Sequence, residues 1–109
     1  MPQLPTTLPT LDELIGRPDL DGVDPVDHLL ALTEADAGRD HVFTLHAELE
    51  GGAYLESFER LLRTWHARGV HLTDLATYAG TLDIHKLPRC KIVAGTVPGR
   101  SGVLASQAQ

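Results

Sequence analysis

The chain has 109 residues, a formal net charge of −6 and a single cysteine. This length predicts one small domain or part of one, and the negative charge disfavours general nucleic-acid binding. One cysteine excludes an intrachain disulfide and a cysteine-rich zinc site. No apolar run reaches the ~18–20 residues that span a bilayer, and the N-terminus lacks a secretory signal pattern. We therefore expect no transmembrane segment and a cytoplasmic location.

The charge is distributed unevenly along the chain. All 15 carboxylates lie in residues 1–83, whereas residues 84–109 contain no carboxylate and four basic residues, namely Lys86, Arg89, Lys91 and Arg100. A basic C-terminal segment on an acidic body can bind an anionic ligand or contact the body itself. We favour contact with the body.

The first part of the chain predicts an extended start and two helices. Residues 2–10 contain three prolines, which fix φ and cannot donate to a β-ladder, so an extended loop or an edge strand is expected. Thr10 followed by Glu13 is a capping-box pattern that begins a short helix over residues 11–15. Asp24-Pro25 begins a second helix, because aspartate caps well and proline suits the first helical position.

The middle of the chain predicts a strand followed by a long helix. Residues 41–47 are rich in β-branched and aromatic side chains and indicate a buried strand. Residues 53–68 place their apolar side chains on one face, which is typical of an amphipathic helix. The remaining expected elements are a strand at 70–72, a helix at 75–78, a loop at 79–89, a strand at 91–94 and an irregular tail over 95–109.

The alternation of strands and helices predicts an α/β fold with parallel strands. A parallel sheet needs cover on both faces, and two or three strands are too few for that. We therefore expect residues 1–109 to form a single partial domain, which is a section of a larger α/β fold.

His46 is the candidate catalytic residue. It lies at the C-terminal end of the predicted strand 41–47, the edge at which α/β folds gather ligands and catalytic groups. Histidine can hold or pass a proton near neutral pH. The alternative is a half-buried histidine that bonds a backbone carbonyl.

Two further patterns are candidate binding sites. His46, Glu48 and Glu50 alternate and could share a face as metal ligands, but we favour two solvated carboxylates at a loop, so no metal site is expected in this chain. Residues 95–102 are rich in glycine, and Arg100 adds a planar donor for phosphate or carboxylate. The alternative for this segment is a flexible basic tail.

Four segments in this order resemble the C-terminal portion of the polysaccharide deacetylase family, most closely its bacterial branch that deformylates 4-deoxy-4-formamido-arabinose linked to undecaprenyl phosphate. The segments are LPTTLPTLDELIG (4–16), FTLHAELEGG (43–52), SFERLLRTWHARGVHLTDL (57–75) and LPRCKIVAGTVPGRSGVLASQ (87–107). The resemblance covers nearly the whole chain and is least clear over 17–41.

The resemblance implies a distorted (β/α) barrel whose members remove N-acyl groups from amino sugars with a zinc-like divalent metal. Leu45-His46 matches the family's late Leu-His pair, so the resemblance implies that His46 is the acid or orients it. It also implies an amino sugar linked to undecaprenyl phosphate as substrate, with Arg100 near the phosphate, and a location that includes peripheral association with the inner membrane. The family often has an aspartate after this histidine, where this chain has Ala47.

The chain departs from the family because the paired-aspartate, His-x-x-x-His and Arg-Pro motifs are missing, and no two of its six histidines are four residues apart. A full barrel takes about 250 residues, so the resemblance implies only the C-terminal section. We expect the segment of an amino-sugar N-deacylase, inactive alone. The alternatives are a non-catalytic module that completes a barrel with a separate N-terminal half, or self-associates, and a fragment that folds poorly.

Overall fold

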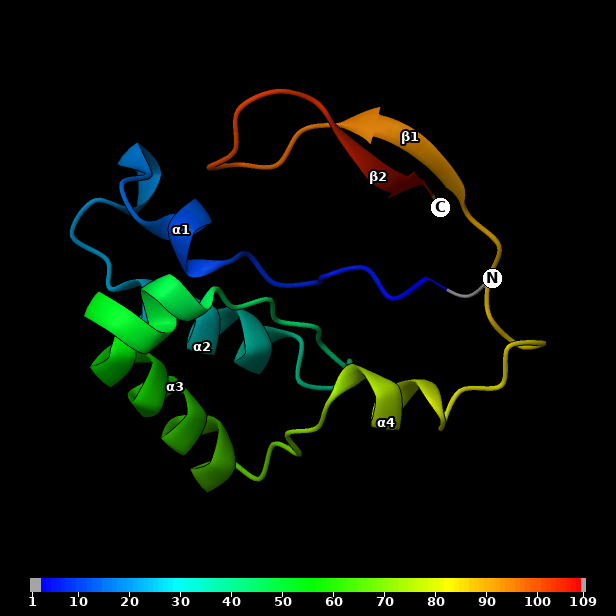
Figure 1. The fold of residues 1–109 in the computed structure, drawn as a ribbon, viewed down its shortest axis with the longest axis horizontal. Helices are drawn as coiled ribbons and strands as arrows, with labels where there is room; N and C mark the ends of the chain where they lie inside the picture. Colours follow the sequence, from blue (N-terminus) through cyan, green and yellow to red (C-terminus); the bar gives the residue numbers. More distant parts are fainter. Residues whose placement is uncertain (1–2, 109) are drawn as a thin grey trace.

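The computed structural model describes residues 3–108, which form a group of helices and a separate two-stranded hairpin (Figure 1). The elements in chain order are the helix α1 (Leu11–Leu14), the 3-10 turn η1 (Pro18–Leu20), the helix α2 (Pro25–Ala35), the π-helical turn η2 (Leu49–Ala53), the helices α3 (Leu55–Ala67) and α4 (Leu75–Ala79), and the strands β1 (Lys91–Gly95) and β2 (Leu104–Ala108). No helix within these residues is long and apolar enough to cross a membrane.

The helix starts lie where the sequence predicts them. At α1, Glu13 N–H donates to the Thr10 hydroxyl (3.4 Å) and Thr10 N–H donates to Glu13 Oε1 (2.9 Å), which completes a capping box. At α2, Val26 N–H donates to Asp24 Oδ1 (2.8 Å) and Pro25 occupies the first turn. These caps satisfy N–H groups that the helices cannot pair internally. The predicted helices at 11–15, 53–68 and 75–78 are confirmed in type.

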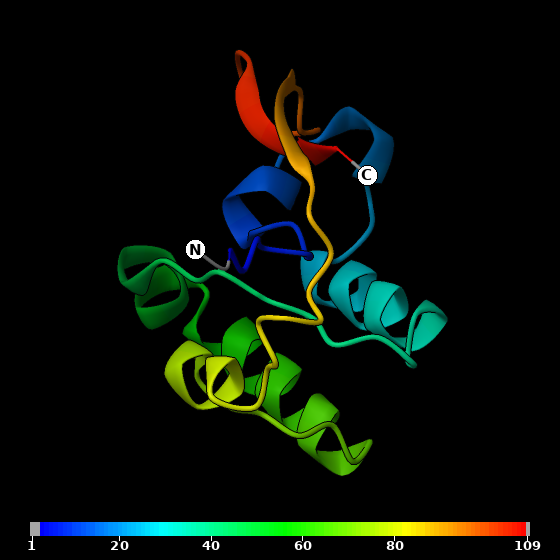
Figure 2. The same cartoon turned by 90° about the vertical axis from the view of Figure 1, so that its right-hand side faces the viewer.

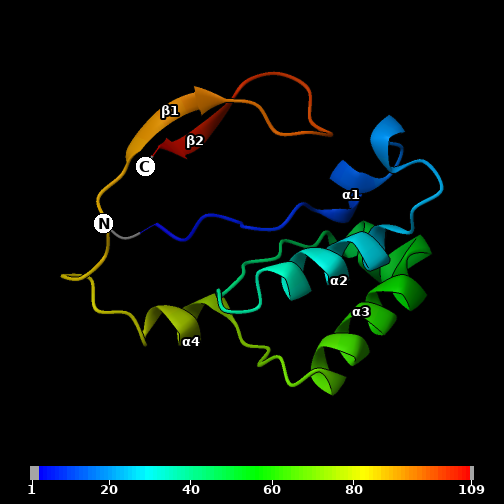
Figure 3. The same cartoon turned by 180° about the vertical axis from the view of Figure 1, so that it is seen from behind.

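The hydrophobic core lies where α2 and α3 pack together beneath α1 (Figure 3). Leu11, Leu29 and Leu61, one from each of these helices, are fully buried. Trp65 of α3 is also buried, and its indole N–H donates to the Thr33 hydroxyl (3.0 Å). These contacts hold α1 on top of the helical pair, which fixes the position of the polar side chains that α1 carries.

The hairpin is antiparallel, and it stands apart from α3 and α4 at the opposite end of the molecule (Figure 2). Lys91 pairs with Ala108, and Gly95 pairs with Leu104. The strand predicted at 91–94 is confirmed, whereas the prediction of an irregular tail over 95–109 is wrong for 104–108, which form β2. One proline and two glycines in 98–102 allow the chain to turn back, so that β2 can pair with β1.

The strands predicted at 41–47 and 70–72 do not form. Residues 41–45 are extended but follow the N-terminal segment without a ladder: Val42 C=O accepts from Thr7 N–H (3.0 Å), and Val42 N–H donates to the Thr7 hydroxyl (2.8 Å). High β-propensity means that residues suit an extended backbone. A strand also needs an adjacent segment whose backbone N–H and C=O groups are free to pair with it. Among residues 3–108, the expected parallel sheet is therefore absent, and the structure is a mixed α/β arrangement whose sheet is the single antiparallel pair.

Candidate functional site

His46 lies between two acidic elements, α1 and the turn that leads into η2. It is not at the end of a strand, as the sequence predicted, but at the start of this turn, where its C=O accepts from Leu49 N–H and Glu50 N–H (both 3.0 Å). Its own N–H donates to Glu50 Oε2 (2.9 Å). Glu50 and His46 therefore bond each other twice, and this pair of bonds fixes the His46 backbone.

Glu50 is a buried carboxylate with one oxygen bonded and one free. The residue is 1% exposed, Oε2 bonds the His46 N–H, and Oε1 is buried without a partner among the residues that the structure describes. A buried carboxylate is costly unless hydrogen bonds compensate for lost hydration. The bond to His46 supplies part of that compensation, which ties the burial of Glu50 to the position of His46.

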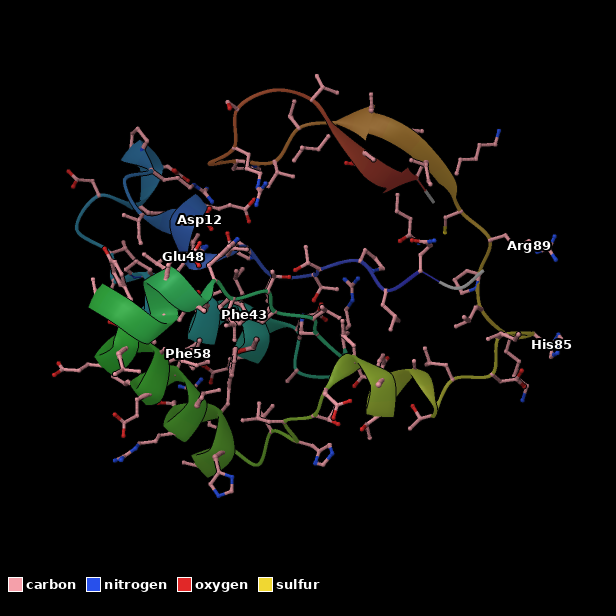
Figure 4. The ribbon with its side chains drawn as sticks, in the orientation of Figure 1. Asp12, Phe43, Glu48, Phe58, His85 and Arg89 are labelled. Atoms are coloured by element: carbon pink, nitrogen blue, oxygen red, sulfur yellow. The ribbon has the colours of Figure 1, made fainter. Side chains whose placement is uncertain are left out.

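Asp12 approaches the His46 ring from α1. Asp12 Oδ1 lies 3.7 Å from His46 Nδ1, and the Thr10 hydroxyl donates to the same carboxylate. Figure 4 shows Asp12 above the turn that carries Glu48, which follows His46. The Thr10 hydrogen bond, together with the positive charges of His46 and Arg100, lowers the pKa of Asp12 below its ordinary value, against a smaller opposing effect of burial.

Arg100 contacts α1 from the loop between the two strands. Its Nε donates to Glu13 Oε2 (2.8 Å), and the Glu13 side chain is 7% exposed while that of Arg100 is 43% exposed. Gly99 lies against the Glu13 backbone at the same place. The preference for contact of the basic segment with the acidic body is confirmed at Arg100, and its predicted substrate role stays a prediction.

This ion pair predicts a dependence of stability on pH. Burial alone raises the pKa of Glu13, but the Thr10 N–H bond and the Arg100 guanidinium outweigh it, so its pKa is lowered in the fold. A lowered pKa means that the stabilisation is present above the pKa of the unfolded chain and is lost as pH falls through the lower folded value. We expect the free energy of unfolding, measured by urea titration, to drop from pH 6 to pH 3.

The variant Glu13→Gln tests whether Glu13 causes this dependence of stability on pH. The variant should unfold with a smaller difference between pH 6 and pH 3 than the parent chain, because its side chain does not titrate. Glu59→Gln is the control, since Glu59 is an exposed residue whose Arg63 contact lies on the surface of α3. An unchanged pH dependence in Glu13→Gln would show that the capping carboxylate is not responsible.

The bond between Glu50 and His46 gives a second prediction. Glu50→Ala removes a buried partner from the His46 N–H and should lower the free energy of unfolding by about 1–3 kcal/mol. Glu48→Ala, two residues earlier on an exposed position, should change it by less than about 0.5 kcal/mol. Equal effects of the two variants, measured by urea titration, would contradict the role assigned to Glu50.

The predicted trio His46, Glu48 and Glu50 does not converge. Glu48 is exposed, Glu50 is buried, and one Glu50 oxygen is occupied by the His46 backbone. Within residues 3–108, no three side chains of histidine, cysteine, aspartate or glutamate are placed to hold a metal ion. These three residues therefore do not form the metal cluster considered for them, and the acidic side chain near the His46 ring is that of Asp12.

The sequence did not reveal Asp12, Glu13 and Glu50 as neighbours of the candidate residues His46 and Arg100. The pattern around Thr10 predicts only a helix cap, and nothing in a spacing of 34 or 87 residues indicates a contact. The sequence offers Glu50 as a metal ligand or, preferably, as a solvated carboxylate, and the second prediction is wrong because Glu50 is 1% exposed. The one signal in the sequence is the spacing of four residues between His46 and Glu50, which allows the Glu50 side chain to reach the His46 backbone N–H within one turn.

Two curated proteins are similar to this chain over nearly its whole length. One, from Shewanella sediminis (strain HAW-EB3), is 32% identical over 107 residues, which are 98% of this chain and 34% of that protein. The other, from Wigglesworthia glossinidia brevipalpis, is 33% identical over 106 residues, which are 96% of this chain and 36% of that protein. Both carry the name "Probable 4-deoxy-4-formamido-L-arabinose-phosphoundecaprenol deformylase ArnD".

The chain spans about a third of the length of these relatives, consistent with the C-terminal portion of a deformylase. The predicted resemblance to the deformylases is thus confirmed. No family model matches the chain, and no solved structure matches it.

Proposed function

We propose that this chain is the C-terminal segment of an amino-sugar N-deacylase of the polysaccharide deacetylase type. The observation that carries the proposal is the similarity of 96–98% of the chain to proteins named as deformylases. The family resemblance of Leu45-His46 adds His46 to the proposal as the acid or the residue that orients it. The polysaccharide deacetylase barrel belongs to this proposal, and the hairpin and helices described above would be part of it. The metal ligands of such a protein would lie outside this chain.

His46 has the chemistry that the reaction needs. Deformylation adds water across the C–N bond of a formamide, releasing formate and a free amine, and the departing amine nitrogen must receive a proton. The His46 side chain is 36% exposed although its Nδ1 is buried. The exposed side of the ring is therefore the side away from Nδ1, and we infer that His46 gives its proton from Nε2.

The substrate class follows from the relatives' printed name, which specifies an arabinose-phosphoundecaprenol. The Arg100 side chain is 43% exposed while its Nε bonds Glu13. Its other guanidinium N–H groups can therefore donate to a phosphate oxygen. We therefore keep the lipid-linked phosphate as the proposed ligand of Arg100. Such a substrate would bring the protein to the inner membrane surface.

The isolated chain should be inactive, which is a prediction of its own. Formate release from a formamido-sugar substrate should be undetectable with or without added zinc, because residues 3–108 hold no cluster of metal ligands and His46 alone supplies only part of the chemistry. Robust turnover by the purified chain that is lost in His46→Ala would contradict the proposal that the metal ligands lie outside this chain.

A chimera tests the proposed function directly. The corresponding third of the Shewanella sediminis relative is replaced by this chain, and formate release is measured with the lipid-linked substrate that the relative's name specifies. We expect activity above that of the relative truncated before the replaced segment. A folded chimera with no more activity than the truncated relative would contradict the proposal.

A second candidate function is a non-catalytic module that completes a barrel with a separate N-terminal chain. Large apolar side chains on and beside the hairpin favour it, because Ile92 is 76% and Val103 is 68% exposed, as is usual for surfaces that another element covers. Mixing the chain with the separately purified first two thirds of the relative distinguishes the two. Restored formate release would support assembly, and an absence of binding would exclude it.

A further inference from the structure

We propose that a groove between α1 and the start of α2 binds the isoprenoid hydrocarbon of the lipid-linked substrate; this inference rests on the proposed function. The groove has a volume of about 410 Å³ and lies where the chain passes from α1 through η1 to Pro25. In Figure 1 this connection is the blue loop that leaves α1 and descends to α2. The volume is within the range of small-molecule sites, so the groove can hold only the isoprene units nearest the phosphate.

The lining of the groove is mostly apolar, and part of it faces solvent. Leu20 and Tyr54 pack against the hydrophobic core, whereas Ile15 is 37% exposed and Val23 is 46% exposed. Exposed aliphatic side chains that lie together are typical of a surface that binds an apolar partner. The apolar lining residues include Leu14, Ile15, Pro18, Leu20, Val23 and Tyr54.

The charges around the groove favour hydrocarbon over the anionic part of a substrate. Arg17 is the cation of the lining, and Asp19 already accepts from its Nε (3.0 Å) and its Nη2 (2.6 Å). The phosphate therefore has its free donors at Arg100 and not in the groove. A hollow of about 460 Å³ on α3 does not suit hydrocarbon, because its lining is chiefly charged, with Glu56, Glu59, Arg60 and Arg63.

The groove adjoins the candidate site because the same elements build both. Glu13 of α1 bonds Arg100, and the two residues that follow Glu13 line the groove. Tyr54 lines it directly after η2, the turn that bonds the His46 N–H. Successive helical residues rise by about 1.5 Å, so a phosphate at Arg100 would place the first isoprene units beside the groove.

Farnesyl monophosphate, a short isoprenoid phosphate, tests the groove in the 109-residue chain without any activity. We expect it to shift the Ile15 and Val23 methyl resonances and to bind at least about 10-fold more tightly than inorganic phosphate, because hydrocarbon burial adds to the phosphate contact. Val23→Ser should weaken its binding by about 10-fold, the usual effect of a lost apolar contact in a pocket. Val70→Ser should leave binding unchanged, since Val70 is similarly exposed (42%) but does not line the groove.

Three results would overturn the inference. The first is equal affinity for farnesyl monophosphate and inorganic phosphate, and the second is an equal loss in Val23→Ser and Val70→Ser. The third is binding to phosphatidylglycerol vesicles that is lost in Val23→Ser, without binding of farnesyl monophosphate, which would assign the groove to membrane lipid. If Val23→Ser fails to fold, Ile15→Ser takes its place.

The chimera separates this inference from the proposed function. Val23→Ser should raise KM for the lipid-linked substrate by about 10-fold with kcat changed less than about 2-fold, because the hydrocarbon does not take part in the reaction. An active chimera whose KM is the same in Val23→Ser would overturn the inference and leave the proposed function standing. An inactive parent chimera, with the expected binding of farnesyl monophosphate, would reject the proposed function and leave the groove standing.

Discussion

His46→Ala in the active chimera should lower kcat by about 10²–10⁴-fold, which is the usual contribution of a positioned acid or base. The substitution removes the imidazole that we propose protonates the departing amine, while the backbone bond of residue 46 to Glu50 is available to alanine as well. The loss should therefore fall on the chemical step, and KM should change little.

His71→Ala is the matched control, because it removes an imidazole from an exposed position away from α1. Its kcat should equal that of the parent chimera. An unchanged kcat in His46→Ala, or an equal loss in both variants, would remove the acid role from His46. Steady-state formate release at several substrate concentrations separates kcat from KM.

Gly99→Ala should destabilise the chain by about 2–4 kcal/mol, or release the loop from α1, because two separate costs fall on one residue. Gly99 has φ +88°, a backbone conformation that residues with a Cβ rarely adopt, and an added Cβ would collide with the Glu13 carbonyl oxygen. Since that neighbour is backbone, it cannot rotate away. The Arg100–Glu13 bond depends on the same close approach.

Gly102→Ala separates the two costs. Gly102 also has a positive φ of +80°, but an added Cβ meets no atom within 4 Å. It should cost only the backbone term of about 1–2 kcal/mol. Urea titration gives the stabilities, and the Arg100 Hε resonance reports whether the bond to Glu13 survives. Equal stabilities with the bond intact in both variants would contradict the close packing of the loop on α1.

The helices could be predicted because their signals are local. Thr10 and Glu13 are three residues apart, and Asp24-Pro25 are adjacent, so capping chemistry can be read within one turn. The long helix α3 follows from the spacing of its apolar residues. Such patterns do not depend on any distant part of the chain.

The strands were predicted poorly because a strand is defined by its neighbour. Residues 41–45 have the right propensity, but the Thr7 side chain takes the backbone N–H of Val42. Residues 104–108 have weak propensity, and they become β2 because the loop returns them to β1 in register. Pairing between segments is a tertiary property that propensity does not contain.

The candidate site was predicted in part. His46 and Arg100 were singled out, and the structure brings both against α1, through Asp12 and Glu13 respectively. Their carboxylate partners could not be predicted, because a capping box explains Glu13 fully and gives no reason to look for a distant arginine. The site therefore depends on how α1 packs, which only the fold shows.

The central claim is that this segment supplies the group that moves the proton and that the ion belongs elsewhere in the protein. Zinc bound to the purified 109-residue chain after dialysis against a weak chelator, measured by elemental analysis, tests it most directly. The account predicts zinc far below one ion per chain, with no difference between the parent and His46→Ala. One tightly held ion per chain, lost in His46→Ala, would contradict it.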